Sequence, residues 1–288
     1  MLLKNIRMEN LFCPVVLLLG VFIMLPAAGG AEIAFNEMTA NSSKPVLNLA
    51  SYALDDKYKG CMNAMKSNLK SLLKMELATS QTYKATWEEA LKEWKKEKDS
   101  KSLPRNITDF AEVAILTYTS EVPKIYKEFN TATQTAGKGP KEYEAYPFKS
   151  LHFLLTWAAK AFQSMQPKCI NVYRGTNVKF SIKKMFRFGQ FTSTSEDKKV
   201  ASRFGKATFF ELFTCKGYSI NERSMFKYED EVLIPPYELF QVVSVNNTEK
   251  GKTIKVKSRG SCSNHNCAFV GKGWNGTTTC PDHQVLYL

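Results

Sequence analysis

The ten residues from Tyr228 to Tyr237 read YEDEVLIPPY, so three acids stand directly before a short apolar run. An apolar run of this length that ends at two prolines predicts a strand, and successive side chains of a strand point to opposite faces. We therefore expect Glu229 and Glu231 to share one face and Asp230 to lie on the other. Like charges held this close make each other's ionisation more costly. The stretch thus predicts a strand whose two glutamates face a cation.

The chain before this strand is helical, and the chain around it is rich in strands. Between about residues 60 and 166, apolar residues recur at three- and four-residue spacing in MKSNLKSLLKMEL, TWEEALKEWKKEK, TDFAEVAILTY and FKSLHFLLTWAAKAF. From about 168 to 260, β-branched and aromatic runs such as INVYRG and ATFFELFTC are separated by Gly, Pro, Asn and Ser. Helices followed by strands predict an α+β fold. Short connections favour one domain over residues 32–288, with a disulfide-rich tail at 261–288.

Two local signals predict where helices begin. Thr108 followed by Asp109 predicts a helix start, with Glu112 as the acid of a capping box. The segment EDKKVASRFG predicts a short helix that interrupts the strands, with Ser195 as its cap and Gly205 at its end.

The first 31 residues have the pattern of a secretory signal peptide. Lys4 and Arg7 precede the apolar run LFCPVVLLLGVFIMLP, and small residues follow it. A membrane anchor is the alternative, but the run is short and contains Pro14. The C-terminal residues CPDHQVLYL lack the hydrophobic tail of a lipid-anchor signal. We expect a secreted, extracellular protein without a stable membrane anchor.

The surface is expected to be basic and glycosylated. The formal net charge is +13, and the lysines are spread through KKEKDSK, SIKKMFR and GKTIKVK. This spread favours solvated faces, with attraction to an anionic ligand or a polyanionic cell surface as the alternative. We expect no nucleic-acid partner. Acceptor sites for N-glycosylation occur at Asn41, Asn106, Asn246 and Asn275.

The cysteines predict three disulfides. Cys13 lies in the signal segment, which leaves Cys61, Cys169, Cys215, Cys262, Cys267 and Cys280. An even number in an exported chain indicates disulfides, although the sequence leaves their pairing open. The three cysteines of the tail could instead form a zinc site with His283. In an oxidising compartment disulfides are the stronger interpretation, so we expect no metal.

Three clusters near strand ends carry candidate chemistry. Arg174 ends a strand beside Gly175 and offers a planar, charged fork that suits a phosphate or carboxylate. Alternation in FTSTS puts Phe191, Ser193 and Ser195 on one face, so that two hydroxyls stand beside an aromatic ring. The third cluster is the acidic stretch described above. Each cluster alone has an ordinary structural interpretation, and only their combination indicates a function.

In this order, the arginine, the S-T-S strand and the E-x-E pair resemble the signature of arginine-specific mono-ADP-ribosyltransferases. The chain is similar to the vertebrate extracellular branch of that family over almost the whole mature sequence. The similarity includes ALDDKYKGC, FKSLHF, RFGQFTSTS, RFGKATFF, EVLIPPYELFQV and HNC. It implies an ADP-ribosyltransferase fold, with a split mixed β-sheet that forms an NAD cleft after an N-terminal helical region.

The resemblance implies roles for the residues of the three clusters. Glu231 matches the acid that stabilises positive charge on the ribose carbon as nicotinamide departs. Glu229 would face the acceptor guanidinium, orient it and help to remove a proton. Arg174 matches the arginine that holds the NAD phosphates, with Gly175 allowing close approach. Ser193 matches the serine that positions the nicotinamide ribose and the catalytic acid.

Further contacts are implied less directly. Gln190 and Phe191 would contact nicotinamide, and Tyr118 on the helix AILTYT would also contact NAD. The segment NERSMFKY corresponds to the family's substrate-recognition loop, in which Ser224 would bind NAD and Phe226 the acceptor.

The resemblance also implies a pairing of the cysteines. Cys61 would pair with Cys267 and Cys169 with Cys215, which leaves Cys262 and Cys280 as the third pair.

The implied function is transfer of ADP-ribose from NAD to arginine side chains of extracellular or cell-surface proteins. NAD would be a co-substrate, no metal would take part, and the enzyme would act as a monomer. One alternative is an NAD glycohydrolase, in which water replaces arginine, and the presence of Glu229 argues against it. The other is a catalytically silent, secreted binding protein on the same scaffold, and the intact acid pair argues against that.

Overall fold

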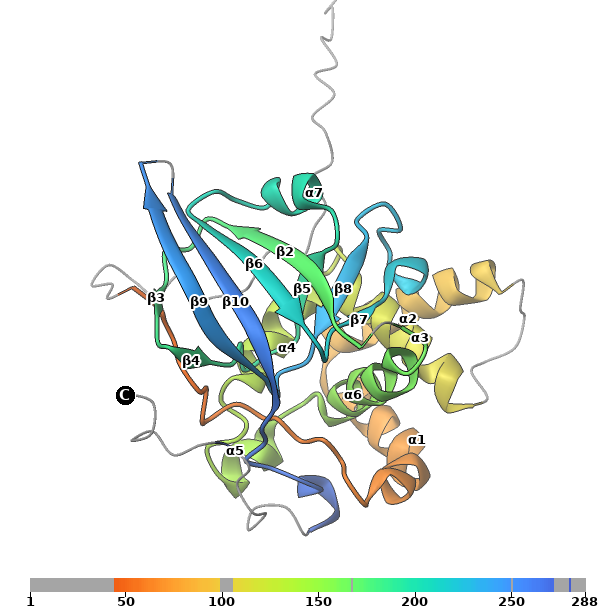
Figure 1. The fold of residues 1–288 in the computed structure, drawn as a ribbon. Helices are drawn as coiled ribbons and strands as arrows, with labels where there is room; N and C mark the ends of the chain where they lie inside the picture. Colours follow the sequence, from red (N-terminus) through yellow and green to blue (C-terminus); the bar gives the residue numbers. More distant parts are fainter. Residues whose placement is uncertain (1–43, 99–105, 167, 250, 272–279, 281–288) are drawn as a thin grey trace, which may run out of the picture.

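The computed structural model describes residues 44–98, 106–166, 168–249, 251–271 and 280 (Figure 1). The predicted signal segment, the acceptor sites Asn41 and Asn275, and His283 lie outside the described residues. In the described part, no helix is both long enough and apolar enough to cross a membrane.

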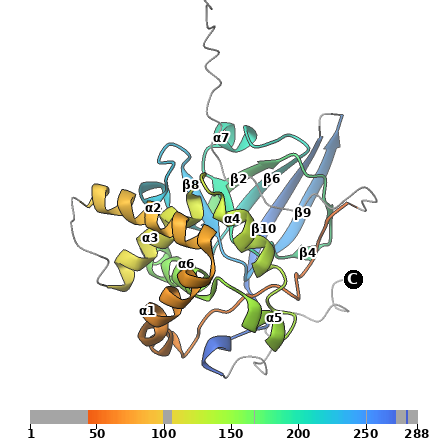
Figure 2. The ribbon, with the colours of Figure 1, turned by 180° about the vertical axis from the view of Figure 1, so that it is seen from behind.

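A group of amphipathic helices precedes the main sheet. They are α1 (Met62–Thr79), α2 (Gln81–Glu97), α3 (Ile107–Thr119), α4 (Ile125–Thr133), α5 (Pro140–Ala145) and α6 (Lys149–Gln163). Each of the four predicted helical patterns forms one of these helices. Both views show α1, α2, α3 and α6 gathered on the side of the sheet where β8 lies, away from β9 (Figures 1 and 2).

The strands of the described chain form one mixed sheet and one small parallel pair. The sheet has the order β4-β9-β10-β6-β2-β5-β8-β7, in which β10 runs parallel to β6 and the other neighbours are antiparallel. Helices followed by a mixed sheet confirm the predicted α+β fold. The strands of the sheet are β2 (Ile170–Thr176), β4 (Met185–Phe186), β5 (Thr192–Ser195), β6 (Thr208–Thr214), β7 (Tyr218–Ser219), β8 (Glu231–Ile234), β9 (Glu238–Thr248) and β10 (Gly251–Ser261), and the separate pair is β1 (Val46–Leu47) with β3 (Ser181–Ile182).

The sheet is split between β2 and β5. β2 pairs with β6 along its whole length, and β5 pairs with β8 along its whole length. Between β2 and β5, however, only Tyr173 and Ser195 are paired in the backbone ladder. The expected split mixed sheet is therefore confirmed, and this single pair is the only backbone pairing between the two strands.

β8 is buried on both of its faces. Leu233 belongs to the core that the helices build, together with Phe191 of the segment before β5. Val232 and Ile234 belong to a second core on the other face, which includes Phe210 of β6. A strand covered on both faces reads as a continuous apolar run, which explains the sequence EVLI.

The short helix α7 (Lys198–Ser202) lies against β2, and a glycine makes this approach possible. A Cβ atom on Gly175 would come within 2.5 Å of the carbonyl oxygen of Gly205 and equally close to that of Ala201. The cap of α7 is Asp197, whose carboxylate accepts hydrogen bonds from the backbone of the first turn. The prediction of Ser195 as the cap was wrong, because α7 begins at Lys198 and the Ser195 hydroxyl instead accepts a hydrogen bond from the backbone N–H of Asp197.

The start of α3 also differs from the prediction. Asn106 caps the helix and forms a capping box with Asp109, so the acid of the box lies three residues before the expected Glu112. Glu112 is instead buried, and its Oε2 accepts a hydrogen bond from Nε1 of Trp94 at 3.0 Å. Asn106 is exposed, as is Asn246 on β9, so both described acceptor sites for glycosylation lie on the surface.

Asp55 joins segments from both ends of the described chain. Its carboxylate forms a fully buried ion pair with Arg187 and accepts hydrogen bonds from the backbone N–H groups of Asn264 and His265. The neighbouring Asp56 accepts from the backbone N–H of Cys267 at 2.9 Å. The early motif ALDDKYKGC and the late HNC therefore bind each other.

Three disulfides stabilise this arrangement, and they are the expected pairs: Cys61–Cys267, Cys169–Cys215 and Cys262–Cys280. All three tail cysteines are used in these bonds, so they do not form the alternative zinc site.

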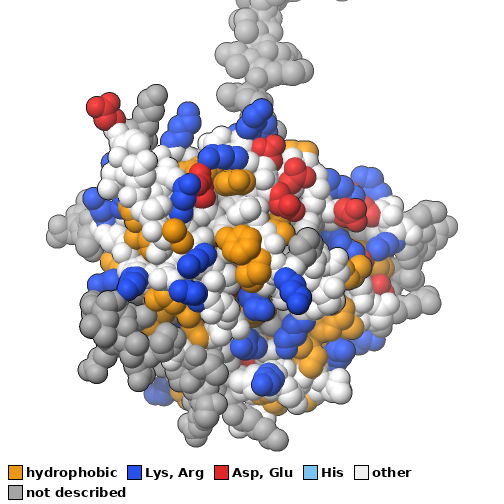
Figure 3. Space-filling view, in the orientation of Figure 1, with side chains coloured by type: hydrophobic (Ala, Val, Ile, Leu, Met, Phe, Trp, Pro, Cys, Tyr) orange, Lys and Arg blue, Asp and Glu red, His pale blue; other side chains and the backbone are white. Residues whose placement is uncertain are grey.

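Basic side chains are scattered over the face shown in Figure 3 rather than gathered in one patch, and acidic side chains are concentrated in its upper part. This distribution agrees with the interpretation of the lysines as solvated surface residues.

Removing the Cys61–Cys267 bond should destabilise the fold more than removing Cys262–Cys280. The first joins residues 206 positions apart and the second residues 18 apart. The longer loop constrains the unfolded chain more, by about 5 against about 3 kcal/mol in the loop-entropy description. Denaturant unfolding of the two double Cys→Ala variants under the same oxidising conditions measures the difference. Equal losses of stability would contradict this order.

Candidate functional site

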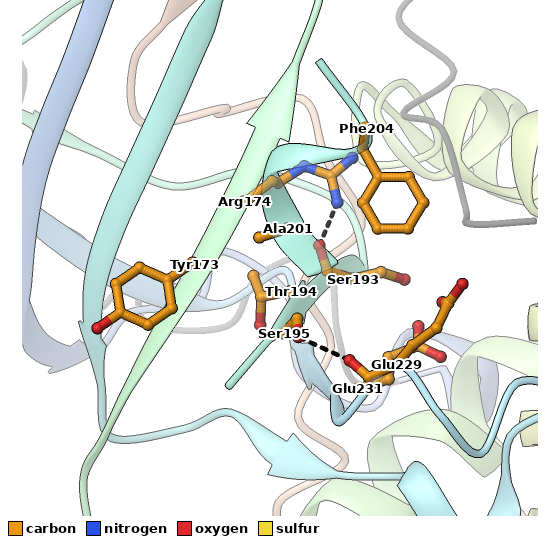
Figure 4. A pocket seen from close by; sticks show the side chains of 9 residues that line it. All are labelled: Tyr173, Arg174, Ser193, Thr194, Ser195, Ala201, Phe204, Glu229 and Glu231. Atoms are coloured by element: carbon orange, nitrogen blue, oxygen red, sulfur yellow. Dashed lines mark hydrogen bonds between the residues drawn. The ribbon is translucent and has the colours of Figure 1, made fainter. Parts of the chain in front are cut away.

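A narrow pocket lies where the sheet splits (Figure 4). It encloses about 290 Å³ of empty space, part of which is open to solvent. β2, β5, the α7 segment and the start of β8 all contribute to its walls. The lining residues are Tyr173, Arg174, Ser193, Thr194, Ser195, Ala201, Phe204, Glu229 and Glu231.

Arg174 carries a buried positive charge on one wall. The residue is 6% exposed, and its Nη1 donates a hydrogen bond to the carbonyl oxygen of Ser193 across the split. Its Nε has no hydrogen-bond partner among the described residues. Burial lowers the pKa of Arg174 to about 10, opposed by Tyr118, Tyr126 and Glu231, so the guanidinium remains charged at neutral pH. A buried cation with an unused donor indicates a site for an anionic ligand.

The three hydroxyls of β5 have different surroundings. Ser195 donates to the carbonyl oxygen of Glu229 at 2.6 Å, and Thr194 donates to that of Val232 at 2.7 Å. Both bonds hold β5 against the segment that carries the acids. The hydroxyl of Ser193 is buried and has no hydrogen-bond partner among the described residues. Of the three, Ser193 is therefore the one available to a ligand.

The two glutamates reach the pocket by a different route from the one predicted. β8 begins at Glu231, and Asp230 has a φ of 46°, in the left-handed region that aspartate tolerates better than most residues. Glu229 therefore precedes the strand, and the prediction that strand alternation aligns the two acids was wrong. A backbone reversal at Asp230 brings both carboxylates to the same pocket (Figure 4).

Glu231 is the more deeply buried acid, with 3% of its surface exposed. Its Oε2 accepts a hydrogen bond from the hydroxyl of Ser224 at 2.9 Å, and its Oε1 has no partner among the described residues. Burial raises the pKa of Glu231, and the hydrogen bond from Ser224 and the charge of Arg174 oppose this rise. A carboxylate in these surroundings is stabilised by any cation that enters the pocket.

Glu229 is buried less deeply but is also hard to ionise. Burial, followed by the charges of Glu231 and Glu121, raises the pKa of Glu229 to about 8, and Arg203 lowers it only in part. Glu229 is therefore mostly protonated at neutral pH in the free protein. Its ionisation is favoured when a cation binds beside it.

Several predicted site residues lie behind the pocket rather than in it. Tyr118 is buried, and its hydroxyl donates to the carbonyl oxygen of Phe191 at 3.0 Å. The ring of Phe191 is stacked against Phe129 in the helical core. Gln190 is buried and accepts a hydrogen bond from Gln134 at 2.5 Å. These residues fix the course of the chain into β5.

The remaining predicted residues do not line the pocket but contact other parts of the protein. Gly175 faces the α7 segment, as described above. Phe226 does not line the pocket, and its ring lies edge-on to that of the exposed Tyr228. Ser224 is buried behind Glu231 and holds that carboxylate in place.

Sequence reasoning missed Tyr173, Thr194, Ala201 and Phe204 as lining residues. Tyr173 and Thr194 stand beside predicted residues, so strand adjacency could have identified them. Ala201 and Phe204 reach the pocket because α7 lies against β2. Gly175 in YRG and Gly205 in RFG could have indicated in the sequence that these two segments pack closely.

Taken together, the pocket presents one buried guanidinium, one free hydroxyl and two carboxylates that are costly to ionise. This combination suits a ligand that has both anionic and hydroxyl groups and that also develops or introduces positive charge.

Comparison with known proteins agrees with this chemistry. The profile of the family described as NAD:arginine ADP-ribosyltransferase (ART) matches residues 47–264. An erythroblast NAD(P)(+)--arginine ADP-ribosyltransferase of Gallus gallus is 38% identical over 258 residues, which are 88% of this chain and 85% of that protein. The ecto-ADP-ribosyltransferase 5 of Bos taurus is 38% identical over 78% of this chain and 75% of its own length.

Solved structures give the same result. The crystal structure of the eukaryotic mono-ADP-ribosyltransferase ART2.2 superposes with a TM-score of 0.66 at 35% identity, covering 77% of this chain and 98% of that one. A variant of ART2.2 in complex with NAD superposes with a TM-score of 0.67 at 34% identity, over the same shares of the two chains. From its sequence and its fold, the chain belongs to the NAD:arginine ADP-ribosyltransferase family.

Proposed function

We propose that this protein transfers ADP-ribose from NAD to the side chain of arginine and releases nicotinamide. The observation that carries the proposal is the pocket at the split of the sheet. There Arg174, Ser193 and Glu231 each bury a polar atom that has no partner among the described residues, and Glu229 lies beside them. Such unpaired polar atoms suit a ligand with phosphates and ribose hydroxyls, which NAD has.

The reaction exchanges one bond to the ribose carbon for another. The bond between this carbon and the nicotinamide nitrogen breaks, and its electron pair leaves with nicotinamide. A guanidino nitrogen of arginine supplies the electron pair of the new bond and loses one proton. NAD and arginine thus give ADP-ribosyl-arginine, nicotinamide and a proton, without an oxidant or a metal.

Arg174 and Ser193 would bind NAD in this proposal. Arg174 contributes a fixed charge and an unused Nε donor for the phosphates, and burial strengthens both. Ser193 contributes a hydroxyl beside the acid. Glu231 would lie next to the ribose carbon and stabilise the positive charge that develops as nicotinamide leaves.

Glu229 would act on the acceptor. A guanidinium is a poor nucleophile because it is positively charged, so it needs an anion to orient it and to accept a proton. Approach of the guanidinium favours the ionised form of Glu229, which burial and neighbouring charges otherwise disfavour.

We also propose that the enzyme acts as a monomer on extracellular or cell-surface proteins. Arg174, Ser193, Glu229 and Glu231 all belong to this chain, so the proposed reaction does not require a residue from a second copy. Three disulfides suit an oxidising compartment, and the signal segment at residues 1–31 would direct the chain there. The similar protein of Bos taurus is named as an ecto-enzyme.

The proposal is tested with NAD labelled in its adenosine part and poly-arginine as the acceptor. Label on the polymer, with the modified side chain identified as arginine by mass spectrometry, supports it. Release of free ADP-ribose without labelled polymer would indicate an NAD glycohydrolase, and intact NAD would indicate a binding protein.

Arg174→Lys should weaken NAD binding more than the conserved charge suggests. Lysine keeps the positive charge but loses the planar two-point contact with phosphate. We expect the dissociation constant for NAD to rise by about 10- to 100-fold, or about 1–3 kcal/mol, without loss of folding. Calorimetric titration measures it, with Arg259→Lys on the exposed face of β10 as the matched control. An unchanged affinity would make Arg174 a structural residue.

Glu231→Gln and Glu229→Gln should affect different parts of the reaction. Loss of the charge at Glu231 should suppress both transfer and hydrolysis of NAD, by a factor of about 10²–10³. Loss of the charge at Glu229 should suppress transfer to arginine and leave hydrolysis of NAD largely intact. Nicotinamide release and arginine labelling are followed in the same samples. Equal loss of both activities in Glu229→Gln, or wild-type transfer by Glu231→Gln, would refute this assignment.

The ratio of transfer to hydrolysis should rise with pH until Glu229 is ionised. Because the pKa of Glu229 is about 8, its carboxyl is protonated below that pH and cannot accept a proton from the acceptor. We expect the ratio of the two kcat/KM values to fall about tenfold for each pH unit below 8 and to level off above it. Glu229→Gln should give a low ratio that does not change with pH. A flat ratio in the wild-type enzyme would contradict the role of Glu229.

A further inference from the structure

We propose that Glu121 is a second carboxylate of the acceptor site, which holds the guanidinium of the incoming arginine together with Glu229. This inference rests on the proposed function and adds a binding residue to it. Glu121 follows α3 in the sequence, and it is far along the chain from the three motifs, so no motif pointed to it.

The end of α3 is fastened to the loop that leads to Glu229. The backbone N–H of Met225 donates to Oγ1 of Thr119, the last residue of α3, at 3.1 Å. The preceding residue of that loop, Ser224, donates to Glu231. The segment that carries Glu121 is therefore held beside the acidic side of the pocket.

Only one of the two carboxylate oxygens of Glu121 has a partner among the described residues. One oxygen, Oε2, forms an ion pair with Lys124 at 2.6 Å. The other, Oε1, is buried and has no hydrogen-bond partner among the described residues. A buried acceptor without a donor is unfavourable, so this oxygen favours a ligand that supplies an N–H group.

Glu121 is also close enough to Glu229 for the two charges to interact, because its charge contributes to the raised pKa of Glu229. The three carboxylates of this series differ in exposure: Glu231 and Glu229 are buried, and Glu121 is partly exposed. The unpaired Oε1 of Glu231, which is 3% exposed and lines the pocket, independently marks this series as a ligand site.

A guanidinium matches two carboxylates better than one. It has five N–H donors in a rigid plane and can bond to one carboxylate along each edge. Glu229 would then face the nitrogen that attacks the ribose carbon and accept its proton, and Glu121 would bind the opposite edge. The exposed cation Arg203 follows α7 and lowers the pKa of Glu229, so its charge also acts on this carboxylate.

The test compares Glu121→Gln with Lys124→Met, using agmatine as the acceptor at about pH 9, where Glu229 is ionised. If Glu121 binds the guanidinium, Glu121→Gln should raise KM for agmatine about tenfold and leave hydrolysis of NAD within about twofold of wild type. Lys124→Met frees the second oxygen and should leave KM unchanged or lower it. If the ion pair between Glu121 and Lys124 has only a structural role, Glu121→Gln and Lys124→Met should change KM for agmatine in the same way.

Glu128→Gln, an exposed position on α4, is the matched control for charge and should leave both activities unchanged. An unchanged KM in Glu121→Gln, or an equal rise in both variants, would overturn this inference while leaving the proposed function intact. If Glu121→Gln misfolds and loses hydrolysis of NAD, Lys124→Met decides alone: a raised KM for agmatine would overturn the inference about Glu121, and an unchanged or lowered KM would support it.

Failure of the wild-type enzyme to label agmatine or poly-arginine would overturn both the inference about Glu121 and the proposed function.

Discussion

The rest of the structure depends on one fully buried ion pair, between Asp55 and Arg187. Burial alone would raise the pKa of Asp55, but the hydrogen bond from His265 and the charge of Arg187 outweigh it and lower the pKa to about 2. Arg187 also donates to the carbonyl oxygens of Leu49, Ala50 and Cys262. A buried pair of this kind adds little net stability over an apolar pair, but the loss of one partner leaves an uncompensated charge and costs about 3–5 kcal/mol. Its main effect is to permit only one arrangement of three distant segments.

This arrangement determines where the pocket forms. Arg187 lies between β4 and β5, so fixing its guanidinium also fixes the start of the chain that runs through Gln190 and Phe191 to Ser193. The helical core then holds Phe191 through its contact with Phe129 and the hydrogen bond from Tyr118. On the other wall, pairing with β6 fixes Arg174. The pocket is therefore a product of two separately anchored halves, and the residues that anchor them lie mostly outside it.

The sequence was sufficient to predict the class of fold and the four polar residues that meet in the pocket. Helical and strand periodicities are local properties, and the spacing of Arg174, Ser193, Glu229 and Glu231 follows a family signature. The reversal at Asp230 could not be predicted, because an isolated left-handed residue has no periodic pattern. The packing of Gln190, Phe191 and Tyr118 behind the pocket could not be predicted, because it depends on which helices cover β5, and their contacts with a ligand stay predictions. Gly175 was selected for a close approach to phosphate, which stays a prediction, and the structure shows that the α7 segment also approaches it closely.

Because the sheet is split, a ligand bound in the pocket also links the two halves of the protein. Elsewhere in the sheet, neighbouring strands are joined by ladders of hydrogen bonds, but β2 and β5 share only the pair Tyr173 and Ser195. A molecule bound between Arg174 and Glu231 contacts both halves at once and substitutes for the missing ladder. Occupancy should then stiffen the enzyme between its two halves. Because the phosphates and the ribose both stay in the ADP-ribosyl part, this link ends only when the ADP-ribosylated product leaves. Turnover and the rigidity of the scaffold are in this way controlled by the same few contacts.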